Sequence, residues 1–152
     1  MARLPPSGFP PWPRCSGKCG GAPCQPEGAP ALRAFAPCKT VSETNRRDRW
    51  GLVKRKEEQH AAVLEAVSVA LAQPGNALPE KGPWYVRYTR VARSPIQDLG
   101  VNLPAALKAV EDQVCACLKV DDGDRAYQPE YRQEPLRGRE EGVLVEVWGA
   151  PS

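Results

Sequence analysis

Three aspartates lie within four residues at Asp121-Asp122-Gly123-Asp124. Carboxylates this close repel one another unless a cation lies among them. Mg²⁺ prefers oxygen ligands, usually one or two protein carboxylates together with waters and substrate phosphate. The segment therefore predicts either half of a Mg²⁺ site or an ordinary polar turn, for which an Asp-Gly pair is typical. An EF-hand calcium loop is excluded because the twelfth position from Asp121 is Arg132.

Other chemistries have weaker support in the sequence. The only histidine is His60, which argues against a histidine dyad or a multi-histidine metal site. Four cysteines near the N-terminus could bind Zn²⁺, but their spacing of three, four and thirteen intervening residues is wider than that of structural zinc sites. These four are Cys15, Cys19, Cys24 and Cys38. We expect them to be free thiols, with a zinc site as the alternative.

The composition predicts one globular domain with an N-terminal extension. The chain has 152 residues and 17 prolines, and the prolines are concentrated in its first third. We expect residues 1–30 to be a disordered Pro/Gly/Cys-rich tail and residues 31–149 to form the domain. The sequence contains neither an apolar run of about 20 residues nor a signal peptide, so we expect a cytoplasmic protein that does not enter membranes.

The charge is unevenly distributed, although the net charge is only +3. Residues 81–95 contain four basic side chains and no acid, whereas residues 96–124 contain six acids and only two lysines. Carboxylates that hold a cation, flanked by basic residues that hold phosphates, would suit an enzyme that acts on a polyanion. Ordinary solvated faces are the alternative interpretation.

The elements that must position these residues follow from periodicity. A helix is predicted from about Arg46 to Gln73, and a second from Asn102, as its N-cap, to about Lys119. Strands are predicted at 31–37, 84–92, 126–133 and 143–148, with the third at a sheet edge because it contains Pro129. This order predicts an α+β fold in which two helices pack on a small mixed sheet.

The two helices have predicted buried stripes. The stripe of the first helix comprises Trp50, Val53, Glu57, Ala61, Leu64, Val67 and Leu71. The stripe of the second comprises Leu103, Leu107, Val110, Val114 and Leu118, with Lys108 and Asp112 together on another face.

Two separated stretches resemble the RusA family of Holliday-junction endonucleases, in the form carried by phages and prophages. The first is Ser42-Glu43-Thr44-Asn45-Arg46-Arg47 followed by Trp50 and a basic helix. The second is Asn102-Leu103, then Leu107 to Asp112, then Val120 to Asp124, with Tyr131 and Gln133 soon after. The resemblance covers roughly residues 38–148.

The resemblance implies a homodimer that cuts branched DNA by Mg²⁺-assisted phosphodiester hydrolysis. It makes Asp121 and Asp122 metal ligands, Lys108 a stabiliser of charge on the phosphate, and Asn102 and Asp112 supporting residues. The expected contacts with the DNA backbone are Arg46, Arg47, Lys54, Arg55, Arg87 and Arg90.

The chain departs from the family pattern in the loop before the second helix. The pattern Asp-x-Asp-Asn expects acids where this sequence has Leu99 and Val101, which leaves Asp98 as a substitute metal ligand and catalytic acid. A relative with reduced activity, or one that only binds branched DNA, is therefore an alternative to an active endonuclease. A zinc-stabilised interaction module built on the N-terminal cysteines is a third interpretation.

Overall fold

The computed structural model describes residues 28–41, 49–97 and 99–149. Within these ranges the chain forms four strands and two helices in the predicted order. They are β1 (Leu32–Pro37), α1 (Arg49–Leu71), β2 (Trp84–Ala92), α2 (Asn102–Leu118), β3 (Tyr127–Pro135) and β4 (Gly142–Trp148). The predicted α+β class and element order are confirmed.

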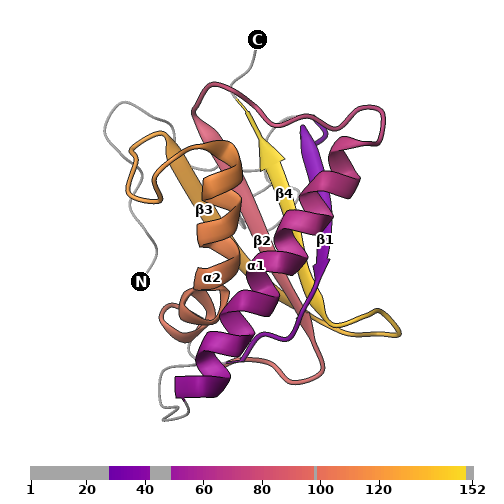
Figure 1. Cartoon of the computed structure of the whole chain (residues 1–152), viewed down its shortest axis with the longest axis vertical. Coiled ribbons are helices and arrows are strands. Elements are labelled where there is room, and N and C mark those ends of the chain that lie inside the picture. Colours follow the sequence, from indigo (N-terminus) through magenta and orange to yellow (C-terminus); the bar gives the residue numbers. More distant parts are fainter. Residues whose placement is uncertain (1–27, 42–48, 98, 150–152) are drawn as a thin grey trace, which may run out of the picture.

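The four strands form one mixed sheet in the order β1-β4-β2-β3 (Figure 1). Strand β4 is antiparallel to both β1 and β2, whereas β3 is parallel to β2. Strand β3 lies at an edge, as the proline inside it predicts. The parallel pair β2 and β3 is joined by α2, which is the connection that parallel neighbours require.

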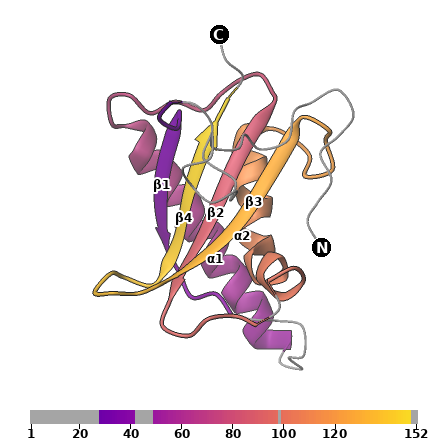
Figure 2. The ribbon, with the colours of Figure 1, turned by 180° about the vertical axis from the view of Figure 1, so that it is seen from behind.

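Both helices pack on one face of the sheet, and the opposite face is seen in the reverse view (Figure 2). The valines of β4 at 143, 145 and 147 point together into the core, as their alternation predicts. The predicted stripe of α2 is also confirmed, since Leu103, Leu107, Val110, Val114 and Leu118 are all buried.

The predicted buried stripe of α1 is wrong except at Val67. Trp50, Val53, Leu64 and Leu71 are exposed. The buried face consists instead of Gln59, Val63, Val67 and Ala70. Alanines beside this face, Ala62 and Ala66, pack against the core and let α1 lie close to its neighbours. Because alanine tolerates either face of a helix, the periodicity of the larger side chains predicted the wrong rotation of α1 about its axis.

Helix α2 ends as predicted but begins differently. Lys119 adopts the left-handed conformation (φ 59°), and the Val120 N–H donates to the Cys115 carbonyl at 3.0 Å, which closes the helix in a Schellman motif. Asn102 is not the N-cap, because it already lies within the first turn and its side-chain amide donates to the Gln97 carbonyl at 3.2 Å. In the described part of the chain, neither helix is long and apolar enough to cross a membrane.

Candidate functional site

The aspartates of the acidic turn have different surroundings. The Asp121 Oδ1 atom accepts a hydrogen bond from the Gly123 N–H at 2.8 Å, and the Asp124 Oδ1 atom accepts one from the Ala126 N–H at 2.8 Å. Such side-chain bonds to the backbone two residues ahead are typical of aspartates that shape turns. Asp122 reaches a side chain of α2 instead. The turn therefore presents one of its carboxylates to the helix before it.

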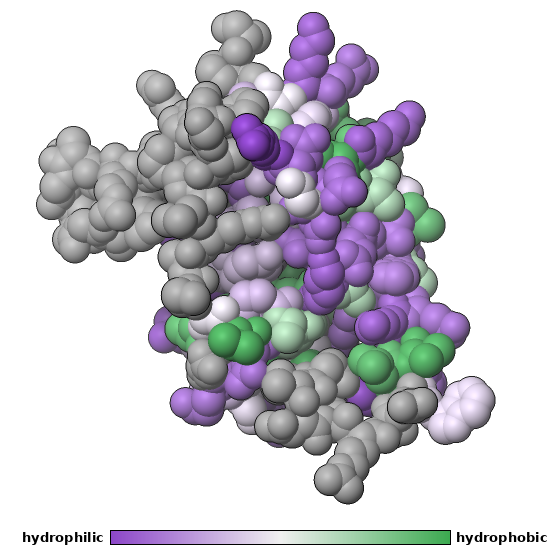
Figure 3. Space-filling view, turned by 90° about the vertical axis from the view of Figure 1, so that its left-hand side faces the viewer, coloured by the Kyte–Doolittle hydropathy of each residue, from purple (hydrophilic) through white to green (hydrophobic). Residues whose placement is uncertain are grey.

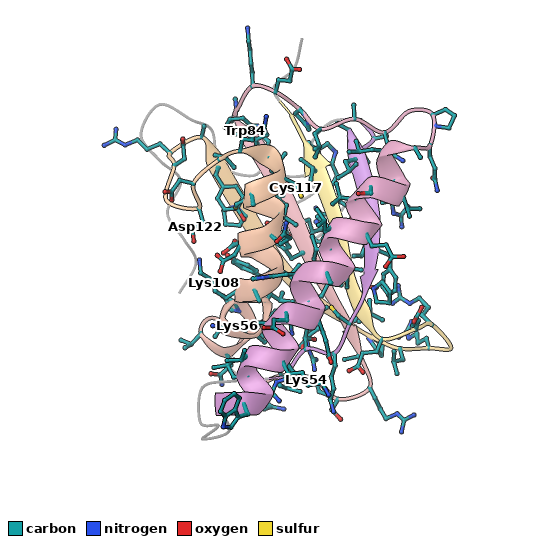
Figure 4. All side chains as sticks on the ribbon, viewed as in Figure 1. Lys54, Lys56, Trp84, Lys108, Cys117 and Asp122 are labelled. Atoms are coloured by element: carbon teal, nitrogen blue, oxygen red, sulfur yellow. The ribbon has the colours of Figure 1, made fainter. Side chains whose placement is uncertain are left out.

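The partner of Asp122 is Lys108, whose ammonium group donates to the Asp122 Oδ2 atom. The same ammonium lies 3.1 Å from Asp112 Oδ1 and 3.9 Å from Glu111 Oε1. The hydrogen bond to Asp122, and further the one to Asp112, raises the pKa of Lys108 above its ordinary value although partial burial opposes the shift. Figure 4 shows Lys108 and Asp122 side by side on the helical face of the molecule. The structure thus brings together three of the predicted site residues.

Sequence reasoning missed Glu111 as a site residue. Its side chain is buried, and its Oε2 atom accepts hydrogen bonds from the hydroxyls of Tyr127 and Tyr131, each at 2.6 Å. Because Tyr127 donates to Glu111, the Tyr88 hydroxyl at 2.8 Å donates to Tyr127 in turn. A signal was present in the sequence: Glu111 follows the buried Leu107 by four residues, so it lies on the apolar stripe of α2.

The Glu111 network joins three elements beneath Lys108. Glu111 belongs to α2, Tyr127 and Tyr131 to β3, and Tyr88 to β2. The rings of Tyr88 and Tyr131 also stack, with centroids 5.9 Å apart. Burial raises the pKa of both Tyr88 and Tyr127 well above the ordinary tyrosine value, which keeps their hydroxyls protonated as donors. The network therefore fixes the part of α2 that carries Lys108 against the sheet.

A groove of about 230 Å³ lies between the first half of α1 and the first half of α2. Its basic side chains are Arg55, Lys56 and Lys108. The rest of its lining is Leu52, Gln59, Ala105, Ala106 and Ala109. Small alanines on α2 leave room for a ligand, and the cations on both walls favour an anionic one. Lys108, the partner of Asp122, is one of the residues that line the groove, whereas Asp122 is not.

The predicted DNA-contacting residues fall into three groups. Lys54 and Arg55 lie on the described part of α1, where Lys54 is exposed and Arg55 half-buried. Arg46 and Arg47 lie outside the described residues, so their role stays a prediction. Arg87 and Arg90 are buried in the sheet, which is at odds with the phosphate contacts predicted for them. Arg87 and Arg90 are three residues apart, so they point to opposite faces of the strand, and both side chains are engaged by protein groups.

The contacts of the two buried arginines are specific. The Arg87 Nε atom lies 3.2 Å from Glu130 Oε2, and its guanidinium carbon lies 5.2 Å from the centre of the Trp148 ring. Arg90 donates to Thr40 Oγ1 at 2.9 Å, to the Thr40 carbonyl at 3.0 Å and to the Ser94 carbonyl at 2.8 Å. Arg90 therefore ties the segment after β1 to the end of β2.

The loop that replaces the first acidic motif is only partly described. Asp98 lies outside the described residues, so its role as a metal ligand stays a prediction. Leu99 and Val101 are each 56% exposed. Because about half of each side chain remains in water, the two residues contribute little hydrophobic stabilisation to the monomer. Among the described residues, no group of three or more His, Cys, Asp or Glu side chains is placed to hold a metal ion.

The described cysteines are free thiols. They are Cys38, Cys115 and Cys117. Burial raises the pKa of Cys38 and of Cys115 to about 12 each, so both are protonated at neutral pH. Cys15, Cys19 and Cys24 lie outside the described residues, and the zinc alternative therefore stays a prediction.

Comparison of the chain with models of protein families, with curated proteins and with solved structures found no match.

Proposed function

We propose that this protein is a Mg²⁺-dependent, structure-specific DNA endonuclease that acts as a homodimer on branched DNA. The observation that carries the proposal is the ion pair of Asp122 with Lys108, a residue that lines the basic groove between α1 and α2. A cation beside a partly exposed carboxylate is an arrangement that phosphodiester hydrolysis can use. The resemblance to the RusA family supplies the substrate class.

The donor atoms near the turn fit Mg²⁺ in chemical type. Asp122 is partly exposed, and Asp121 uses Oδ1 in the turn, so its Oδ2 atom is the oxygen that we assign to the metal. Mg²⁺ takes such carboxylate oxygens together with several waters. When bound, the ion would polarise a phosphate oxygen and lower the pKa of a bound water. Asp98 would add a further carboxylate from the loop before α2.

The groups of the chain itself have separate roles in this proposal. Lys108 stabilises negative charge that develops on the phosphate, and Asp112 and Glu111 hold its ammonium in position. Arg55 and Lys56 line the groove and hold the backbone of the bound strand. Lys54 adds a contact on the exposed side of α1.

The test is cleavage of a synthetic four-way DNA junction with and without Mg²⁺, using the full-length chain and its Asp122→Asn variant. We expect Mg²⁺-dependent cleavage that Asp122→Asn reduces by at least about a hundredfold, the scale on which transition-state electrostatic contacts act. Asp124→Asn is the matched control, since it removes a charge from the same turn while an asparagine Oδ1 still accepts the Ala126 N–H. Equal loss in both variants would contradict a specific role for Asp122.

A second candidate function is binding of branched DNA without cleavage. The observation that favours it is the pair of apolar side chains Leu99 and Val101 at positions where the family pattern has acids. With fewer carboxylates, the cation would be held more weakly while the basic surface stayed intact. Junction binding in EDTA together with no cleavage at any Mg²⁺ concentration would support this function over the first.

The zinc-stabilised module has its own measurement. Metal analysis of the purified full-length chain should give zinc at well below one equivalent if the endonuclease proposal is right. One equivalent of zinc that is lost in a Cys15→Ser and Cys19→Ser double variant would support the zinc alternative instead.

A further inference from the structure

The first turns of α1 present an almost wholly exposed indole. Trp50 is 87% exposed, and Val53, three residues later on the same side of the helix, is half-exposed. A tryptophan side chain gains more from burial than nearly any other, and in a folded monomer it normally covers apolar surface. The Trp50 side chain covers almost no apolar surface of the described protein. A side chain of this size left in water is available to a partner molecule.

The surroundings of Trp50 indicate the chemistry of that partner. Lys54 is exposed and lies one turn after Trp50, at the i+4 spacing that makes two helical side chains neighbours. The first turn of α1 contains no acidic residue. Lys56 follows on the wall of the groove that leads to Lys108. In Figure 4, Lys54, Lys56 and Lys108 succeed one another along the two helices toward Asp122.

The surface around this end of the molecule combines charge with apolar groups. Among the residues that Figure 3 colours, most are hydrophilic, with separate hydrophobic patches toward the lower end and along the upper right. Both helices begin at that lower end (Figure 1). An aromatic ring set among ammonium groups is the combination with which proteins bind single-stranded nucleic acid, since bases stack on the ring and phosphates pair with the cations.

We propose that Trp50 stacks on an unpaired base of the bound nucleic acid, while Lys54 and Lys56 pair with the phosphates of the same strand. The inference rests on the proposed nuclease function for its substrate, because a base at a branch point unpairs and unstacks more readily than a base within a regular duplex. It assigns a distinct task to α1: the groove holds the backbone, and Trp50 recognises that the strand is unstacked.

A contact between two copies of the chain is the rival occupant of this surface. Around a two-fold axis each copy contributes the same residues. A symmetric contact centred on Trp50 would bring Lys54 of one copy near Lys54 of the other, and like charges in an interface are unfavourable. The exposed lysine therefore argues for an anionic partner over a second copy.

The test measures binding by fluorescence anisotropy in EDTA, so that cleavage plays no part. The probes are a short oligothymidine, a four-way junction and a fully paired duplex. The proteins are the full-length chain, Trp50→Ala, Trp50→Phe and Leu64→Ala. Leu64 is a matched control because it is 53% exposed on the same helix, more than three turns from Trp50.

We expect Trp50→Ala to weaken binding of the oligothymidine about tenfold, the scale of one base stacked on an aromatic ring, and to leave duplex binding within about twofold. Trp50→Phe should keep binding within about threefold of the original, since phenylalanine also offers a π face. Leu64→Ala should change none of the three affinities.

Three results would overturn the inference. They are equal weakening for oligothymidine and duplex, a Trp50→Phe variant as impaired as Trp50→Ala, and a change in the sedimentation-derived mass of Trp50→Ala, which would make Trp50 a contact between copies. If the anisotropy results are as expected but no Mg²⁺-dependent cleavage is observed, the proposed endonuclease function is wrong and the stacking role of Trp50 is retained. If cleavage by the original chain is Mg²⁺-dependent but Trp50→Ala leaves all affinities unchanged, the stacking role is wrong and the endonuclease proposal is retained.

Discussion

Lys108 of α2, which lines the groove between the helices, forms an ion pair with Asp122 of the turn that follows α2. The pair holds the turn against the helix through the Asp122 carboxylate, which is itself not part of the groove lining. A metal ion bound to Asp122 would compete with the Lys108 ammonium for the same carboxylate. Asp112, 3.1 Å from the same ammonium, is the group that would retain Lys108 if Asp122 bound the proposed metal ion.

Replacement of Lys108 by methionine tests the role of the ammonium group. Methionine keeps the length of the side chain, and Lys108 is half-exposed, so we expect the fold to survive. Junction cleavage should fall by at least about a hundredfold, because charge on the phosphate loses its nearest fixed cation. Single-turnover cleavage rates measure the effect, and urea unfolding checks the fold. A rate within about threefold of the original would exclude Lys108 from the chemistry.

Asparagine substitutions at Asp121 and Asp122 distinguish a role in the stability of the turn from a role in cleavage. An asparagine at position 121 would still accept the Gly123 N–H through its Oδ1 atom, so Asp121→Asn should leave the stability nearly unchanged. It removes one proposed metal-binding oxygen and should raise the Mg²⁺ concentration needed for half-maximal cleavage. Asp122→Asn should reduce cleavage more than Asp121→Asn does at saturating Mg²⁺. The opposite order would place the main ligand at Asp121.

The buried Glu111 network predicts a stability effect that does not depend on function. Glu111→Ala leaves the hydroxyls of Tyr127 and Tyr131 without their acceptor and opens a cavity, so we expect a loss of about 2–4 kcal/mol in the free energy of unfolding. Tyr131→Phe should cost about 1–2 kcal/mol. Urea unfolding measures both. In a double-mutant cycle of Glu111→Gln with Tyr131→Phe, purely additive losses would argue against a direct hydrogen bond.

The sequence predicted the architecture well because its strongest patterns belong to the core. Alternating valines at 143, 145 and 147 and the spacing of Leu103, Leu107 and Val110 admit only one buried face each. Proline in β3 correctly indicated an edge strand. Each of these signals is local, and tertiary packing did not override it.

The errors share a physical cause, which is that local patterns do not reveal partners from distant segments. The two arginines of β2 are expected to contact DNA, but Glu130 on the neighbouring strand and Thr40 after β1 hold them within the protein. Glu111 lies on the apolar stripe of α2, but the local pattern does not reveal the two tyrosines, 16 and 20 residues later, that hold it in the core. Burial of charged groups becomes visible only when their hydrogen-bond partners are placed.

Alkaline pH should destabilise the protein. Burial raises the pKa of Cys115 to about 12 and that of Tyr88 and Tyr127 well above the ordinary tyrosine value, so the unfolded chain loses these protons at lower pH than the folded chain. A group whose pKa is raised by folding contributes its full stability below its unfolded pKa and loses it as pH rises through the folded value. Stability should therefore be constant from about pH 7 to 8 and decline from about pH 8.5 upward.

Urea unfolding between about pH 7 and 10.5 measures this decline, with Cys115→Ala as the control. Each fully linked group adds a slope of up to about 1.4 kcal/mol per pH unit. The Cys115→Ala variant should start less stable at neutral pH because a buried side chain is shortened, yet decline less steeply above about pH 8.5. Parallel curves for the two proteins would show that the Cys115 thiol ionises as readily in the folded chain as in the unfolded one.

Placing acids at positions 99 and 101 tests whether a shortage of carboxylates at the proposed metal site limits activity. Both side chains are 56% exposed, so Leu99→Asp with Val101→Asp should fold with nearly unchanged stability. If the chain has the site geometry that the RusA resemblance implies, two added carboxylates beside α2 should strengthen Mg²⁺ binding and raise junction cleavage about tenfold or more. Leu99→Asn with Val101→Asn is the control, since it makes the same loop polar without adding charge. Cleavage that rises equally in both double variants would assign the gain to loop polarity, and cleavage that rises in neither would separate this loop from the metal site.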